Sequence, residues 1–119
     1  MADEITVSTI LRVKNGNLEQ TGKSYQTKFS QTTARAGSYT MDVGTTEESI
    51  SFGDIAPGFV RLTNLDTTNF VEVGFSTGVY GMRLSANNGV AMFERKLGTT
   101  VYVKADTTAC KIQVEAINA

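Results

Sequence analysis

Alternation between apolar and polar positions dominates the chain and predicts β-strands. In residues 5–14, the apolar residues Ile5, Val7 and Leu11 fall on one side of an extended backbone, and most residues between them are polar. Successive side chains of a strand point to opposite faces, so this period of two predicts a half-buried strand. The Asn-Gly-Asn sequence at 15–17 then predicts a turn, because Asn and Gly tolerate positive φ.

The same alternation recurs in short segments that are separated by turn residues. Residues 53–58 contain Pro57, the single proline, and form the clearest predicted loop, while residues 34–37 are predicted to interrupt two strands. The one helix candidate, residues 45–49, is a single turn long. Turn signals every 8–12 residues are typical of an all-β sandwich or barrel. About ten strands are predicted, at residues 5–14, 24–32, 38–43, 49–52, 59–65, 70–75, 79–84, 90–95, 100–104 and 110–117.

Length and composition agree with one β domain. The chain has 119 residues, a common size for a single domain. Its 17 Thr and 11 Val are β-branched residues that suit a pleated surface. We therefore expect residues 1–119 to form a single antiparallel β-sandwich, with residues 1–4 as a flexible or partner-contacting arm.

Charge and hydropathy limit the partners. The net charge is −1 and no Lys/Arg block is present, so we expect no nucleic-acid binding. No apolar run approaches the ~20 residues of a membrane helix, and we expect no membrane partner. The acidic start lacks the features of a signal peptide, which predicts synthesis in the cytoplasm. The lone cysteine, Cys110, is in phase with Ile112 and Val114, which predicts a buried thiol.

Catalytic chemistry is not indicated. The chain has no histidine, the commonest general base and metal ligand and the usual partner of a nucleophilic Ser or Cys. Glu47, Glu48 and Asp54 offer oxygen ligands for calcium, but without EF-hand spacing, and ordinary solvation of a loop is the alternative. We expect no enzyme activity, no catalytic residue, no metal and no cofactor.

An Asp-Thr-Thr sequence occurs twice, at residues 66–68 and 106–108. Asp at the first position of a turn accepts a hydrogen bond from the backbone two residues on. The repeat suggests equivalent hairpins at the same end of a sandwich, although common turn chemistry used twice is an alternative.

Three aromatic residues, Tyr25, Phe29 and Tyr39, lie in otherwise polar predicted strands. They are either core residues or part of a surface that another chain covers, since tyrosine is enriched at interfaces. Together with Asp3 and Glu4 of the N-terminal segment, they are the candidate partner-contact residues.

The second half of the chain contains three distinctive segments, at residues 59–74 (FVRLTNLDTTNFVEVG), 82–84 (MRL) and 101–115 (VYVKADTTACKIQVE). In these segments the chain resembles small virion proteins of tailed bacteriophages, and among them most of all capsid decoration (cement) proteins. In that group a strand ending in Asn-Leu-Asp turns into Asn-aromatic-Val-Glu-hydrophobic-Gly, and a later Lys-Ala-Asp-Thr turn leads into the last strand. Glu47 with Gly53-Asp54 is also similar to the loop that precedes this block. The likeness covers roughly the last 75 residues and is loose for the N-terminal strands.

The resemblance implies a β-sandwich or jelly roll that serves as a structural component of the virion. Within that group we favour a decoration protein that binds the outside of the major capsid protein lattice as a homo-oligomer, a trimer or a dimer. A collar, tail or head-fibre component is an alternative, and so is a carbohydrate-binding β-sandwich, because fold alone does not choose between these functions.

Overall fold

The computed structural model describes residues 3–118 and is all-β. It contains twelve strands in four antiparallel sheets, and no helix is present within the described residues. The predicted fold class is therefore confirmed, and residues 45–49, which were expected to form no more than a single turn, contain a bend followed by a short strand. Contacts divide the chain between Thr32 and Thr33 into two compact units, which are described separately.

The first unit is a long β-hairpin. Its base is a six-residue antiparallel pair in which Ile5 lies opposite Phe29, and its tip closes where Asn15 lies opposite Leu18. Gly16 is the first residue of the two-residue turn and has φ of 56°, as a type II′ turn requires. The turn predicted at residues 15–17 is confirmed. The strands are β1 (Ile5–Ile10), β2 (Val13–Asn15), β3 (Leu18–Gln20) and β4 (Ser24–Phe29).

A bulge interrupts this hairpin between its base and its tip. Two residues, Leu11 and Arg12, face three residues, 21–23, on the returning chain. Gly22 has φ of 75°, and a Cβ there would lie 2.2 Å from the carbonyl oxygen of Leu11. Only glycine fits this close approach. The continuous strand predicted at residues 5–14 is therefore two strands, β1 and β2.

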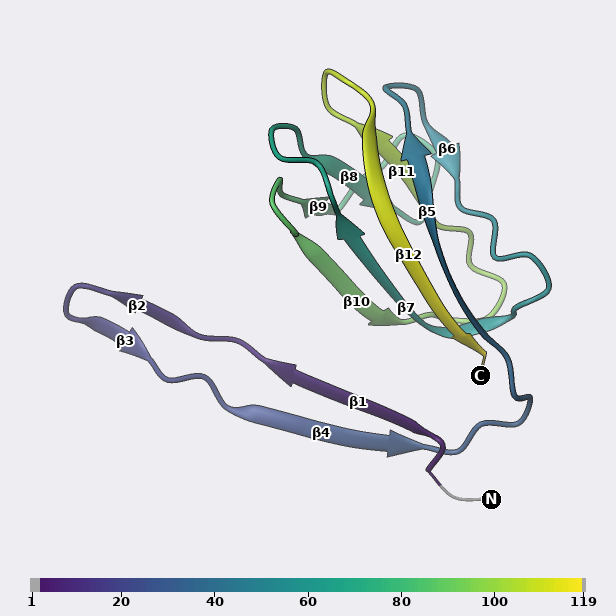
Figure 1. Cartoon of the computed structure of the whole chain (residues 1–119), viewed down its shortest axis with the longest axis horizontal. Coiled ribbons are helices and arrows are strands. Elements are labelled where there is room, and N and C mark those ends of the chain that lie inside the picture. The colour runs from purple at the N-terminus through teal and green to yellow at the C-terminus, as the bar shows by residue number, and fades with distance from the viewer. Residues whose placement is uncertain (1–2, 119) are drawn as a thin grey trace. The chain divides into compact units, whose positions relative to one another are not determined.

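The second unit is an eight-stranded jelly roll. One sheet has the order β10-β7-β12-β5 and the other has the order β6-β11-β8-β9, and the two form separate layers (Figure 1). The pairs β5–β12, β6–β11, β7–β10 and β8–β9 are all present, as in one long hairpin rolled onto itself. The strands are β5 (Ala36–Val43), β6 (Glu48–Ser49), β7 (Pro57–Asn64), β8 (Val71–Gly74), β9 (Met82–Leu84), β10 (Val90–Glu94), β11 (Tyr102–Ala105) and β12 (Cys110–Asn118).

The core of the jelly roll lies between its two sheets. Alternate residues of β7 and β12 are buried, among them Leu62 and Ile112, and they meet Val73 and Val103 from the facing sheet. Cys110 is buried at the start of β12, with its Sγ 3.5 Å from the carbonyl oxygen of Thr108. Burial, followed by the charges of Asp66 and Asp106, raises the pKa of the Cys110 thiol. The predicted buried thiol is confirmed.

Two strand boundaries differ from the prediction at glycines that other parts of the chain approach closely. Gly37 does not interrupt a strand but lies within β5, where a Cβ on this residue would come within 2.8 Å of Ile55 Cδ1. A Cβ on Gly74 would lie 1.9 Å from the carbonyl oxygen of Val79, so the backbone at Val79 packs closely against the end of β8. The strand predicted at residues 79–84 is consequently reduced to β9.

Candidate functional site

The hairpin exposes large apolar side chains along most of its length. Only Ile5 is buried, and the other residues of β1 to β4 are exposed or half-buried. The half-buried strand predicted at residues 5–14 is therefore wrong in its burial. A two-stranded sheet has no second layer that could bury its apolar face, which explains this exposure. The exposed large apolar residues of the hairpin are Ile10, Leu11, Val13, Leu18 and Tyr25.

Four of the five candidate partner-contact residues belong to this hairpin. The Asp3 N–H lies 3.5 Å from Ser30 Oγ, and Glu4 Oε1 accepts a 2.8 Å hydrogen bond from the backbone of Gln31. These contacts join the start of the chain to the end of β4. Tyr25 is 60% exposed on β4, and the Lys23 ammonium lies 5.5 Å from the centre of its ring.

Phe29 and Tyr39 lie in different units. Phe29 is half-buried at the end of β4, directly opposite Ile5 of β1. Tyr39 belongs to β5 of the jelly roll, and its hydroxyl donates a 2.6 Å hydrogen bond to the carbonyl oxygen of Ser51. Partial burial raises the pKa of Tyr39. Tyr39 thus ties β5 to the loop that follows β6.

Sequence reasoning missed four exposed apolar residues of the hairpin as contact candidates. Period alone placed Leu11 and Val13 on a core face, whereas Ile10 falls on the opposite face and Leu18 lies outside the predicted strands. One feature of the sequence distinguishes these residues from core residues. The alternating segment is followed by a short, polar segment, Leu18–Gln20, which was not predicted to be a strand. The missed residues are Ile10, Leu11, Val13 and Leu18.

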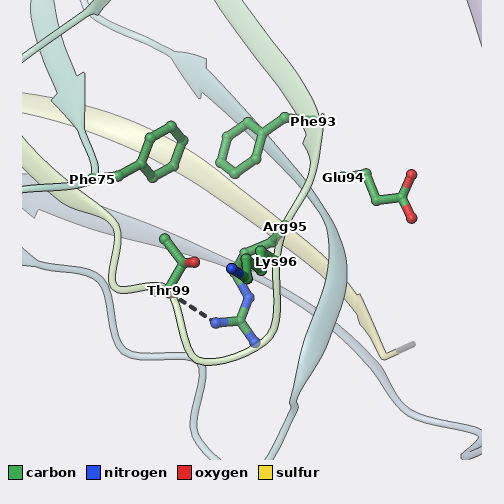
Figure 2. Close-up of a pocket in the computed structure, with 6 residues that line it drawn as sticks. All are labelled: Phe75, Phe93, Glu94, Arg95, Lys96 and Thr99. Atoms are coloured by element: carbon green, nitrogen blue, oxygen red, sulfur yellow. Dashed lines mark hydrogen bonds between the residues drawn. The ribbon is translucent and has the colours of Figure 1, made fainter.

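A pocket of about 350 Å³ opens on the jelly roll beside the end of β10 (Figure 2). Phe75 and Phe93 meet edge to face there, with ring centres 5.4 Å apart. The Arg95 guanidinium donates to the carbonyl oxygens of Pro57 at 2.7 Å and Thr99 at 2.8 Å. Through these two hydrogen bonds the Arg95 guanidinium holds the loop after β10 in place. The pocket is lined by Phe75, Phe93, Glu94, Arg95, Lys96 and Thr99.

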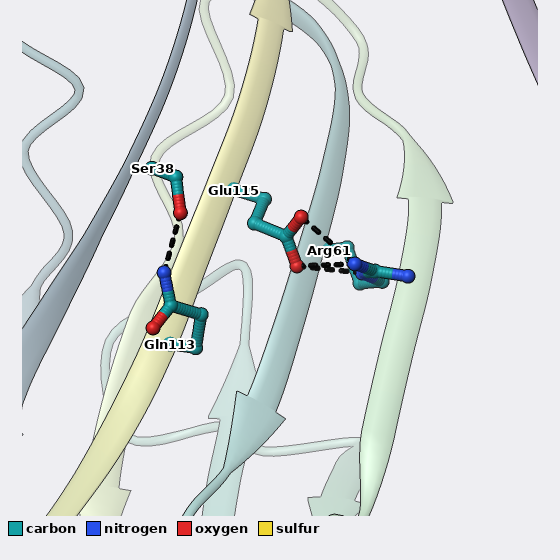
Figure 3. A network of polar contacts seen from close by, with 4 residues as sticks. All are labelled: Ser38, Arg61, Gln113 and Glu115. Atoms are coloured by element: carbon teal, nitrogen blue, oxygen red, sulfur yellow. Dashed lines mark hydrogen bonds and ion pairs between the residues drawn. The ribbon is translucent and has the colours of Figure 1, made fainter.

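Polar side chains form a ladder on the outer face of the β10-β7-β12-β5 sheet (Figure 3). Arg61 on β7 makes a two-pronged pair with Glu115 on β12, through Nε at 2.7 Å and Nη2 at 2.8 Å. Gln113 donates to Ser38 Oγ across the next strand pair. Cross-strand pairs of this kind stabilise a solvent-facing sheet surface, and they give this face a structural role.

The two Asp-Thr-Thr turns lie at the same end of the jelly roll. Thr107 Oγ1 donates a 3.0 Å hydrogen bond to Asn69 Oδ1, and the Asp106 N–H donates to the carbonyl oxygen of Phe70. Asp66 Oδ2 accepts from the backbone N–H groups of Thr68 and Asn69, and these two bonds lower the pKa of Asp66. These contacts confirm that the two turns lie at one end, but each turn joins strands of different sheets, β7 to β8 and β11 to β12, so neither is a hairpin.

The carboxylates considered for calcium turn toward different partners. Glu47 Oε1 accepts from the Gly78 N–H at 2.7 Å and from the Tyr80 hydroxyl, whereas Glu48 Oε2 accepts from the Gly44 N–H at 2.9 Å. The bond from Tyr80 is the largest cause of the lowered pKa of Glu47, and it raises the pKa of Tyr80 to about 12. Within residues 3–118 no three His, Cys, Asp or Glu side chains gather as a metal site would require.

Comparisons with known proteins leave the family open. No family model matches the chain, and no curated protein matches it. One solved structure is similar, a chain from work described as "Bacillus endospore appendages form a novel family of disulfide-linked pili". It is 17% identical over 76% of this chain and 93% of that chain, with a TM-score of 0.38, which is too low to assign a function. No helix in the described part of the chain is long and apolar enough to cross a membrane.

Proposed function

We propose that this chain is a structural, non-enzymatic virion protein that binds the outside of a phage capsid as a decoration protein. The observation that carries the proposal is the exposed hairpin. Two strands alone are at best marginally stable in water, and this pair presents several uncovered apolar side chains. A hairpin of this kind gains stability when another chain covers it.

The choice of partner follows from the resemblance in residues 59–115 to small phage virion proteins, and the jelly roll is a fold that viral capsid domains use. The jelly roll serves as a rigid body in this proposal, and the hairpin supplies part of the contact with the lattice. Several modest contacts with neighbouring capsid subunits then combine through effective concentration into stable binding.

The test adds purified protein to capsids that lack it and measures saturable binding by sedimentation and by imaging. Leu18 at the hairpin tip and Leu97 in a jelly-roll turn are both 61% exposed, so they form a matched pair. Leu18→Asp is expected to weaken binding about tenfold or more, as loss of a buried interface anchor does. Leu97→Asp should leave binding unchanged.

Other outcomes separate the alternatives. Density at the neck or tail instead of the shell would assign the chain to a collar, tail or head-fibre role. Binding to defined sugars on a glycan array, with no binding to any particle, would reject the virion role in favour of a carbohydrate-binding β-sandwich. Equal loss of binding in Leu18→Asp and Leu97→Asp would remove the hairpin from the interface.

A further inference from the structure

Strand β1 has an unprotected edge. It pairs only with β4, so its other edge has no hydrogen-bonded neighbour among the strands of residues 3–118. Its sequence, Ile-Thr-Val-Ser-Thr-Ile, has no charged residue, no proline and no glycine, and each of the other eleven strands of the described chain carries a charge. Proteins protect edge strands with charges, prolines or short length. An uncharged strand of high β-propensity is instead a template for another strand.

The edges of the jelly roll show the protection that β1 lacks. The edge strands β6 and β9 have only two and three residues, which leaves little backbone for a second chain to pair with. The longer edge strands β5 and β10 carry Asp42 and Glu94. The contrast singles out β1 as the edge that is built to be extended.

We infer that β1 pairs antiparallel with β1 of a second copy, around a twofold axis that passes beside Ser8. In this register the numbers of two opposite residues add up to sixteen. Ser8 faces Ser8 of the second copy, and Val7 faces Thr9. Glu4 therefore faces Arg12 of the second copy, and the twofold axis makes this pair twice. Opposite charges directly across two strands are stabilising, and like charges are not. A self-complementary surface of this kind is what a twofold dimer requires.

Charge and side-chain direction select this register over its neighbours. A shift of one residue would place the apolar face of one β1 strand on the same side of the four-stranded sheet as the polar face of the other. An axis beside Val7 would place Glu4 against Ile10 and lose both ion pairs. With the axis beside Ser8, Leu11, which is 78% exposed, lies opposite Ile5 of the second copy.

Both charged residues keep bonding capacity for this contact. Arg12 Nε donates to the carbonyl oxygen of Thr21 at 3.1 Å, and Glu4 Oε1 accepts from Gln31. A guanidinium has five N–H donors and a carboxylate has two acceptor oxygens, so each is able to make a further bond. The result is a four-stranded sheet, β4-β1-β1-β4, which exceeds the three strands needed for independent stability.

The dimer is expected to be weak in dilute solution. One strand edge buries far less than the ~800 Å² per partner of a stable protein contact. Association should therefore depend on concentration and strengthen wherever copies are held close together. Covalent trapping is the measurement that suits such an equilibrium.

Cysteine cross-linking tests the register with a matched control. Directly opposite residues have Cβ atoms about 4.5–5.5 Å apart, so a small approach of the strands brings them within the ~3.5–4.5 Å of a disulfide. Ser8→Cys should form a disulfide-linked dimer in concentrated purified protein. Ser24→Cys lies on the same face but on β4, and should remain monomeric. A mixture of Val7→Cys and Thr9→Cys should yield a linked heterodimer. Unmodified protein is the blank, because Cys110 is buried.

Charge reversal provides an independent test. Glu4→Lys and Arg12→Glu, each alone, should weaken self-association about threefold or more, and the double variant should restore it. Equal cross-linking of Ser8→Cys and Ser24→Cys, or no dimer at millimolar concentration, would overturn the inference. The inference does not rest on capsid binding, because purified protein alone decides it. A monomeric result would leave the proposed function standing.

Discussion

The hairpin and the jelly roll use the same alternating pattern but differ in what covers their apolar residues. Val7 of β1 is half-buried, whereas Val73 of β8, also at an alternate position of a strand, is fully buried. The jelly roll stacks two four-stranded sheets and encloses a core, while the hairpin is a single pair of strands. Alternation therefore sets the extended conformation of a strand, whereas a second layer of structure decides whether its apolar side chains are buried.

The largest expected difference between the two regions is the cost of truncating a leucine. Leu62 is fully buried in β7, and Leu62→Ala should lower the free energy of unfolding by about 2–5 kcal/mol. Leu18→Ala in the exposed hairpin tip should change it by less than about 0.5 kcal/mol. Urea denaturation of the two variants makes the measurement. Equal losses would mean that the hairpin is packed like the core.

An intermediate effect is expected at Asn64, the buried amide that organises one end of the jelly roll. Its Nδ2 donates to the carbonyl oxygens of Asn69 and Leu84, and its Oδ1 accepts from the Asp66 N–H. Asn64→Ala leaves these groups without partners and should cost about 1–3 kcal/mol. Asn17→Ala in the hairpin turn is the control, and the same denaturation assay should show little change for it.

The smallest effect concerns pH and the contact between Glu47 and Tyr80. Because the pKa of Glu47 is lowered in the folded chain, its contribution to stability is present above its ordinary value of 4.5 and is lost as the pH falls through the lowered value. Glu47→Gln should therefore flatten the acid side of the stability profile. It should also move the phenol ionisation of Tyr80 from about 12 toward 10.0, which absorbance at alkaline pH measures.

A hairpin variant supplies the control for this last prediction. Glu19→Gln changes one carboxylate to an amide in β3 and should leave both the acid profile and the Tyr80 ionisation as they are. A Tyr80 ionisation that stays at its original pH in Glu47→Gln would show that the two side chains are not bonded in solution.

Part of the candidate site was predictable from sequence. Asp3, Glu4, Tyr25 and Phe29 lie together in the hairpin because it forms between sequence neighbours through a turn that Gly16 specifies, and their contact role stays a prediction. Tyr39 was grouped with them by residue type alone. Its place in β5, bonded to Ser51, depends on a sheet that closes with the last strand of the chain.

Local patterns in the sequence were enough to predict the all-β class, most of the turns and the burial of Cys110, because period, turn chemistry and side-chain phase are local properties. Tertiary structure alone decided that β5 pairs with β12 and that β7 lies between β12 and β10. It also decided that β1 pairs with β4 in a sheet of only two strands. Pairing between distant strands depends on which faces can be buried together, and no local pattern contains that information.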